Sequence, residues 1–74
     1  MKNPAVILAF GQHLRRLREA RGYSQQELAD IANVAKQTVY RIEKARYVVT
    51  LDVLVSLSEA LQVPLKDLVD FSSA

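Results

Sequence analysis

Residues 24–43 read SQQELADIANVAKQTVYRIE, and this stretch decides the fold of the chain. Ser24 and Glu27 have the spacing of a capping box, which starts a helix at the residue after the serine. Asn33 belongs to a residue type that is enriched at positive φ, so it predicts a tight turn at the end of that helix. A second helix is expected over residues 36–44. The stretch therefore predicts two short helices joined by a turn.

Apolar residues at helical spacing predict further helices on both sides of this pair. The first is expected over residues 4–21, with Asn3 as its N-cap and Gly22 as its left-handed end. Thr50 is expected to cap a fourth helix, and Pro64 to start a short fifth one. The side chains expected to face one shared core are those of Phe10, Leu14, Leu17, Leu28, Ile31, Ala32, Val34, Val39, Ile42, Leu51, Leu54, Leu57, Leu61, Leu65 and Leu68.

The length and composition indicate one folded domain, expected to span residues 1–74. Half of the residues are hydrophobic, which predicts a packed core, and the absence of cysteine excludes disulfides and thiol chemistry. No apolar run approaches the roughly 18 residues of a membrane span. The apolar segment over residues 5–10 is short and no cleavage site follows it, so we expect no signal peptide and a cytoplasmic location.

No residue pattern indicates catalysis or metal binding. His13 is the only histidine, and a lone histidine is expected to lie at the surface rather than to hold a metal. The carboxylates are scattered, without the paired arrangement of glycosidases or two-metal enzymes, and there is no Gly-rich phosphate loop. We therefore expect no enzyme activity, no catalytic residue, no cofactor and no metal.

Charge is distributed unevenly along the chain, although the net charge is only +2. Residues 1–46 contain nine basic and four acidic side chains, whereas residues 47–74 contain one basic and four acidic ones. A positive half beside a negative half suggests a polyanion partner for the positive half, and nucleic acid is the candidate. A merely solvated surface with uneven charge is the alternative.

The predicted helix over residues 36–44 has a polar face that the core does not need. Val39 and Ile42 point to one side of it. The opposite side carries Lys36, Gln37, Tyr40, Arg41 and Lys44. Glutamine can pair with adenine, lysine or arginine with guanine, and an aromatic ring can contact a thymine methyl group. Many surface helices show such residues, but the preceding helix and tight turn favour binding in the major groove of DNA.

A resemblance to a known family rests on two sets of residues. The helical pair contributes Ser24, Gln25, Glu27, Leu28, Ala29, Val34, Thr38, Val39, Ile42 and Glu43. The flanking helices contribute Phe10, Gly11, Leu14, Arg15, Leu17, Arg18, Leu51, Leu54, Leu57, Ala60, Leu61, Val63 and Leu68. With these residues, over about residues 10–68, the chain resembles the phage repressor and Cro (XRE-type) helix-turn-helix family. Within the family the chain resembles small stand-alone regulators such as restriction–modification controller proteins.

The resemblance implies an all-α, five-helix bundle of the lambda-repressor-like type, with the helix-turn-helix at its second and third helices. It implies a sequence-specific, double-stranded-DNA-binding transcriptional regulator. Because one recognition helix reads only a few base pairs, we expect a homodimer on a palindromic operator. Ala29 would let the second helix approach the third closely. The base-contacting residues would be Lys36, Gln37, Tyr40 and Arg41. The phosphate-contacting residues would be Ser24, Gln25, Lys44 and Arg46. Arg18 and Glu43, which flank the apolar faces of their helices, are expected to form an ion pair.

Three single positions and one residue pair depart from the family pattern. The pair is Val48–Val49, which replaces a more polar loop and bears on the phosphate contacts of that loop more than on the fold. Asn33 stands where glycine is usual and is the mildest replacement. Ala35 stands where serine or threonine usually caps the third helix, and the lost cap costs about 1 kcal/mol. Ala45 stands where glycine is usual at the end of that helix. Because alanine resists positive φ, we expect the helix to end differently there or to run on.

An apolar surplus in the last two helices predicts the dimer interface. Its residues are Val53, Val55, Leu65, Val69 and Phe71, with Val6, Ile7 and Leu8 as a second choice. These side chains could instead complete a small core. A different function is also open, that of an antitoxin-like or other protein-interaction module that uses the same fold to bind another protein.

Overall fold

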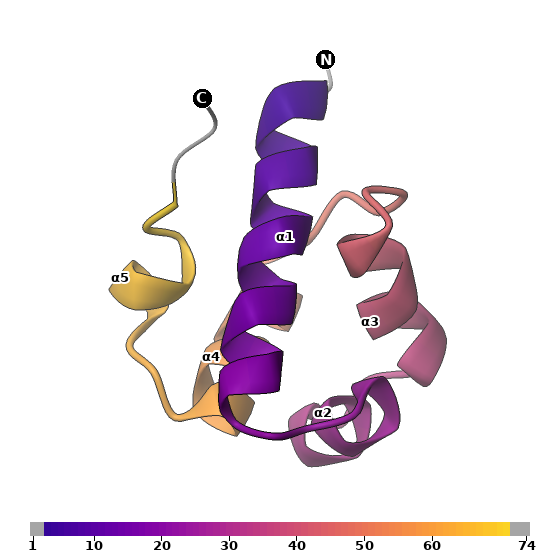
Figure 1. Ribbon diagram of the computed structural model, residues 1–74, viewed down its shortest axis with the longest axis vertical. Coiled ribbons are helices and arrows are strands. Elements are labelled where there is room, and N and C mark those ends of the chain that lie inside the picture. The colour runs from indigo at the N-terminus through magenta and orange to yellow at the C-terminus, as the bar shows by residue number, and fades with distance from the viewer. Residues whose placement is uncertain (1–2, 72–74) are drawn as a thin grey trace.

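The computed structural model describes residues 3–71, and within this range it contains five helices and no strand. The helices are α1 (Pro4–Ala20), α2 (Gln25–Ala32), α3 (Lys36–Glu43), α4 (Leu51–Leu61) and α5 (Leu65–Leu68). α1 runs along the long axis of the molecule, with α2 across its C-terminal end, α3 on one side and α5 on the other (Figure 1). The predicted all-α helix-turn-helix fold is confirmed. None of the helices in this range is long and apolar enough to cross a membrane.

The predicted helix starts and the first two turns are confirmed. The Asn3 side chain accepts a hydrogen bond from the Val6 amide at 3.2 Å. α1 ends at Ala20, one residue earlier than predicted, and Gly22 follows its C-cap Arg21 with φ +74°. At α2 the Glu27 amide donates to Ser24 Oγ at 3.0 Å, while the Ser24 amide donates to Glu27 Oε1 at 2.8 Å. Asn33 then takes the left-handed conformation with φ +59°. α2 and α3 are therefore joined by the tight turn that the asparagine predicts.

The end of α3 differs from the expectation. The helix stops at Glu43, one residue earlier than predicted, and Ala45 adopts φ +58° although alanine resists that conformation. The Ala45 amide donates to the Ile42 carbonyl at 3.0 Å, and the Arg46 amide donates to the Arg41 carbonyl at 2.8 Å. These bonds satisfy the terminal carbonyls of the helix and offset the roughly 1–2 kcal/mol cost of the left-handed alanine. The expectation that alanine would prevent this ending was wrong.

Two side chains assigned to the core are exposed instead. Ile31 is 52 % exposed, because Leu28, Ala29 and Ala32 form the buried side of α2 and Ile31 falls beside it at about 100° per residue. Leu51 is 68 % exposed at the first position of α4, where Leu57 and Leu61 are the fully buried residues. The core itself is shared by all five helices and includes Phe10, Leu14, Leu28, Val39, Ile42, Leu57, Leu61 and Leu68.

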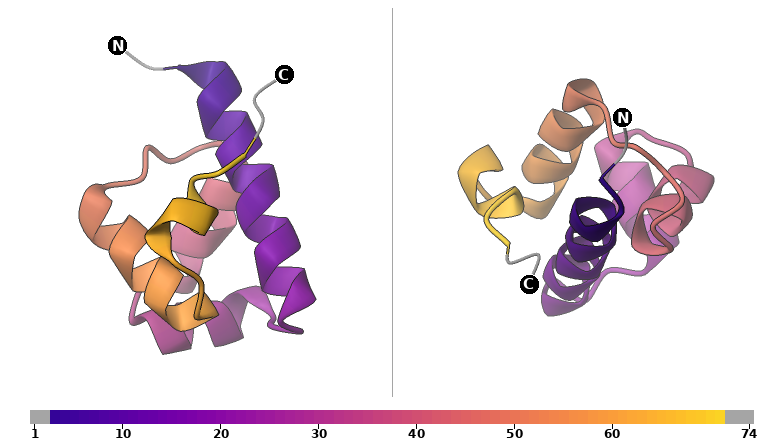
Figure 2. Two further views of the ribbon diagram at one scale, coloured as in Figure 1. Left: turned by 90° about the vertical axis from the view of Figure 1, so that its left-hand side faces the viewer. Right: turned by 90° about the horizontal axis from the view of Figure 1, so that it is seen from above.

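Gly11 lets α1 cross α3 with the two backbones in contact. A Cβ at this position would lie 2.3 Å from the Ile42 carbonyl oxygen, so only glycine fits without a shift of one helix. The close approach fixes how α3 stands against α1. The two helices lie side by side (Figure 2). α2 packs on the same α3. The orientation of α3 is therefore set from two sides.

Candidate nucleic-acid interface

The outward face of α3 is polar and exposed. Val39 and Ile42 are 0 % and 1 % exposed and turn toward the core, as the periodicity predicts. The exposed side chains of the helix are those of Lys36, Gln37, Tyr40 and Arg41, and exposed Lys44 follows as its C-cap. α3 lies at the outside of the bundle (Figure 1). The five polar residues named from the sequence for this face are thus solvent-accessible.

Tyr40 and Lys44 interact with each other on this face. The Lys44 ammonium lies 5.8 Å from the centroid of the Tyr40 ring, within the range of a cation–π contact. The two residues are one helical turn apart, so the ring and the cation occupy neighbouring positions along α3. A tyrosine ring that is held beside a cation offers one flat apolar surface and one charge to a ligand at the same place.

The N-terminus of α3 has no side-chain cap. Ala35 is the N-cap and makes no side-chain hydrogen bond. The amides in the first turn of such a helix point outward and favour an anion. Lys36 adds a positive charge at the same end. The N-terminal turn is therefore suited to a phosphate, provided that one approaches the α3 face.

Arg18 and Glu43 form a buried, two-bond ion pair between α1 and α3. Arg18 Nε donates to Glu43 Oε2 at 2.7 Å, and Arg18 Nη2 donates to Glu43 Oε1 at 3.1 Å. The two side chains are only 10 % and 4 % exposed. The hydrogen bond to Glu43 raises the pKa of Arg18 above its ordinary value, although burial acts in the opposite direction. The pair that the sequence predicts is present and is far more buried than a surface pair.

The predicted phosphate-contacting residues lie around α3, but they differ in whether their side chains already make hydrogen bonds within the chain. Gln25, at the first position of α2, already donates its side-chain amide to Glu43 Oε1 at 3.1 Å. Ser24 Oγ accepts the Glu27 amide as a helix cap. Arg46 is exposed directly after the left-handed Ala45. The sequence did not indicate that Gln25 shares a carboxylate with Arg18, because the three residues are brought together only by the packing of three helices.

The predicted dimer residues divide into two groups. Val55 and Val69 are 39 % and 45 % exposed. Val53, Leu65 and Phe71 are partly buried and pack against the core. The centroids of the Phe71 and Phe10 rings are 5.9 Å apart, so Phe71 packs against the core of its own chain. Val55 and Val69 are therefore the members of the set that are free to meet a second molecule.

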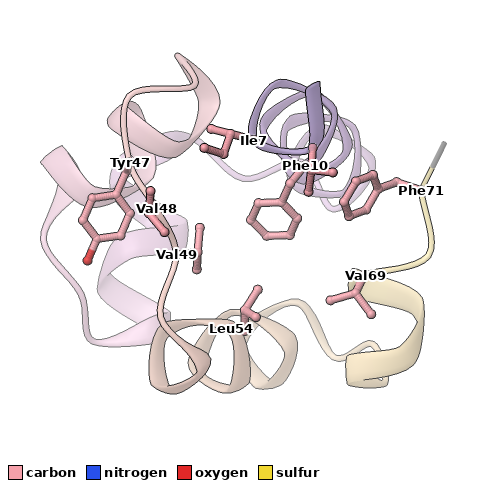
Figure 3. A pocket seen from close by; sticks show the side chains of 9 residues that line it. Ile7, Phe10, Tyr47, Val48, Val49, Leu54, Val69 and Phe71 are labelled. Atoms are coloured by element: carbon pink, nitrogen blue, oxygen red, sulfur yellow. The ribbon is translucent and has the colours of Figure 1, made fainter. Parts of the chain in front are cut away.

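An apolar groove lies beside Val69, between the N-terminal half of α1, the loop after α3, the start of α4 and the C-terminal segment (Figure 3). It has a volume of about 340 Å³ and includes Val6 and Ile7 from the second-choice interface set. Phe71, which lines the groove, also packs on the ring of His13, whose Nε2 lies 2.9 Å from the Asp67 carbonyl oxygen. The sequence suggested no such contacts for His13, since the partners lie more than fifty residues away.

A helix, a left-handed turn and a second helix with an exposed polar face define the helix-turn-helix class of proteins. The chain belongs to the helix-turn-helix family, of XRE type, and the family model matches residues 14–68. A protein of Pyrococcus furiosus, provisionally named an HTH-type transcriptional regulatory protein, is 41 % identical over 64 residues, which are 86 % of this chain and 20 % of that protein. The chain thus spans about a fifth of the length of this curated relative.

Two crystal structures show the same fold. The restriction–modification controller protein C.AhdI from Aeromonas hydrophila is 34 % identical with a TM-score of 0.82, over 84 % of this chain and 94 % of that one. The clp gene regulator ClgR from Corynebacterium glutamicum is 29 % identical with a TM-score of 0.80, over 89 % and 86 %. These homologues are regulators rather than enzymes.

Proposed function

We propose that this chain is a DNA-binding transcriptional regulator that reads the major groove of double-stranded DNA with α3. The observation that carries the proposal is the exposed polar face of α3 on a helix whose other side is fully buried. A helix held in this way can enter the major groove without unfolding any part of the core. The names of the relatives support the same function.

The base-reading residues would be Lys36, Gln37, Tyr40 and Arg41 on the outer face of α3. Gln37 can make paired hydrogen bonds to adenine, and Arg41 or Lys36 to guanine. Tyr40 would present its ring to a thymine methyl group or to the sugar edge. These side chains follow one another on one face, so together they span only a few base pairs.

Contacts to the phosphate backbone would hold α3 in register. The candidates are Ser24, Gln25, Lys44 and Arg46, together with the N-terminal turn of α3. The basic half of the chain contains all of them, and the acidic residues of the C-terminal half would lie away from the DNA. Such contacts contribute affinity for every sequence, and those of the charged Lys44 and Arg46 make binding sensitive to salt.

We further propose a homodimer on a palindromic operator, in the cytoplasm. A sequence of a few base pairs recurs too often in a genome to specify one operator. Two copies related by a twofold axis read two half-sites about one helical turn apart. The exposed apolar side chains that support the proposal are those of Val55 and Val69, and Val69 also lines the apolar groove. Burial of these side chains against a second copy would remove apolar surface from water.

Selection of bound sequences from a random DNA pool tests the proposal. We expect one enriched sequence with twofold symmetry that survives competitor DNA. Absence of enrichment, with only weak salt-sensitive binding, would overturn the sequence-specific function. The alternative, an antitoxin-like or other protein-interaction module, is favoured by the apolar groove. This alternative predicts only weak, salt-sensitive DNA binding together with a tight protein partner.

A further inference from the structure

Gln25 is held by a carboxylate that is itself neutralised by an arginine. Its Nε2 donates to Glu43 Oε1 at 3.1 Å, and the same oxygen accepts Arg18 Nη2 at 3.1 Å. We propose that the Arg18–Glu43 pair is a positioning device that fixes the Gln25 amide so that its second N–H is presented to a DNA phosphate. The proposal rests on the proposed DNA-binding function and adds Glu43 and Arg18 as residues that act through Gln25.

The hydrogen-bonding capacity of the amide supports this role. A glutamine amide nitrogen has two N–H groups in fixed directions in the plane of the amide. When one of them donates to Glu43, the direction of the other is determined. Gln25 is half-buried at the first position of α2, so part of its side chain remains accessible. The side chain is thus ordered before DNA arrives, and binding need not remove its rotamer freedom.

The charge of Glu43 also has to be accounted for. A free carboxylate beside a phosphate-binding amide would repel the phosphate. Two of the Arg18 N–H groups bind this carboxylate, and Arg18 Nη1 donates to the Tyr23 carbonyl at 2.7 Å. The arginine is therefore fixed in place and cancels the charge at short range. Glu43 can then orient Gln25 without opposing the approach of DNA.

Gln26, the next residue, offers a matched control. Its Nε2 donates to Asp30 Oδ1 at 2.8 Å, so it has the same amide–carboxylate chemistry one position along the helix. Both Gln26 and Asp30 are exposed, and in the described part of the chain no cation forms a salt bridge with Asp30. This pair is on a different face of α2 from Gln25. It should therefore contribute nothing to DNA affinity.

The experiment is a mutant cycle on the selected DNA site. Arg18→Met with Glu43→Leu removes the ion pair without changing net charge, and such apolar replacements often preserve stability. We expect Gln25→Ala to weaken DNA binding by about tenfold in the otherwise unchanged protein. The paired replacement should cause a similar loss, and Gln25→Ala should then add almost nothing to it. Equal losses from Gln25→Ala in both backgrounds would overturn the proposal.

Two controls separate positioning from general damage. Arg46→Ala should cause the same loss in both backgrounds and reduce the salt slope by about one ion, whereas Gln25→Ala should leave the slope unchanged because glutamine is neutral. Gln26→Ala should leave affinity unchanged. If Arg46→Ala also costs less affinity in the protein with Arg18→Met and Glu43→Leu, the replacement has displaced a helix rather than only freed the Gln25 side chain. That result would count against the proposal.

A measurement without DNA separates this proposal from the proposed function. In NMR spectra the two side-chain N–H protons of Gln25 should exchange with water at different rates, and the paired replacement should make the rates alike. The Gln26 protons should be unaffected. If no DNA sequence is selected, the proposed DNA-binding function fails, whereas the exchange rates of the Gln25 protons still test whether its amide is fixed. If the paired variant does not fold, the unaltered protein decides, since equal exchange rates of the two Gln25 protons would refute the fixed amide.

Discussion

Arg18 and Glu43 are 25 residues apart in the sequence, and their charged groups meet at 2.7 Å in the interior between α1 and α3. The pair links the helix that forms one wall of the core to the helix that presents the polar face. Glu43 also accepts Gln25 from α2, so three helices meet at one carboxylate. The orientation of α3 therefore depends on a polar contact as well as on apolar packing.

Removal of one partner of this pair should be strongly destabilising. Glu43→Ala leaves the buried Arg18 charge without its carboxylate, and we expect a loss of about 3–5 kcal/mol. That is a large part of the roughly 5–15 kcal/mol stability of a typical domain. Urea denaturation followed by circular dichroism measures it. The exposed Arg15–Glu19 pair, with side chains 63 % and 53 % exposed, is the control, and Glu19→Ala should cost less than about 1 kcal/mol. Similar losses of unfolding free energy from Glu43→Ala and Glu19→Ala would show that burial does not make the Arg18–Glu43 pair more costly to break.

Ala45→Gly should stabilise the protein. The alanine sits at φ +58°, which costs about 1–2 kcal/mol for a residue with a Cβ. Glycine removes this cost but loses about 0.4–1 kcal/mol through its freer unfolded state. A net gain of about 0.5–1 kcal/mol should raise the Tm by a few degrees. Ala20→Gly, at an exposed helical position at the end of α1, should do the opposite. A lower Tm for Ala45→Gly would mean that the alanine is not strained.

Gly11→Ala should separate α1 from α3. The added methyl group would lie 2.3 Å from the Ile42 carbonyl oxygen, which is backbone and cannot rotate away. Overpacking of this kind costs about 1–3 kcal/mol. Thermal unfolding should show the loss, whereas Gln12→Ala, an exposed change at the next position, should stay within about 0.5 kcal/mol. An unchanged Tm for Gly11→Ala would contradict the backbone contact.

Gln37→Ala and Arg46→Ala should impair DNA binding in different ways. Loss of a paired base contact at Gln37 should cost about 1–3 kcal/mol at one base position and relax the preference there. Loss of a phosphate contact at Arg46 should weaken binding to all sequences alike and reduce the salt slope by about one ion. Binding assays on the selected site and on single-base variants, at several salt concentrations, measure both effects. An unchanged base preference in the Gln37 variant would contradict the assignment of base contacts to this face of α3.

Val69→Asp and Val55→Asp should weaken the proposed dimer. Both side chains are exposed and a carboxylate there would have to be buried on association. Sedimentation at micromolar concentration should show a dimer for the original chain and monomers for the variants, with unchanged circular dichroism. Phe71→Asp is less informative, because Phe71 packs on Phe10 and its loss should also destabilise the monomer. A monomer that binds DNA one-to-one would remove the dimer.

The sequence by itself determined the local structure. The Ser24 and Thr50 caps, the left-handed turn at Asn33 and the buried side of α3 each depend on residues within one or two turns of a helix. Capping and periodicity act over that range, so they can be recognised without knowledge of the rest of the chain. The exposed face with Gln37 and Arg41 followed from the same periodicity.

Only the tertiary structure decided which neighbour covers each side chain. Ile31 and Leu51 were expected in the core, yet they are 52 % and 68 % exposed because no helix within residues 3–71 covers them. Ala45 adopts a left-handed conformation because the hydrogen bonds at the end of α3 and the path of the chain toward α4 outweigh its intrinsic preference. The Gln25–Glu43 contact joins residues 18 positions apart. Such contacts depend on how whole helices pack, and burial is a property of that packing rather than of the residue type.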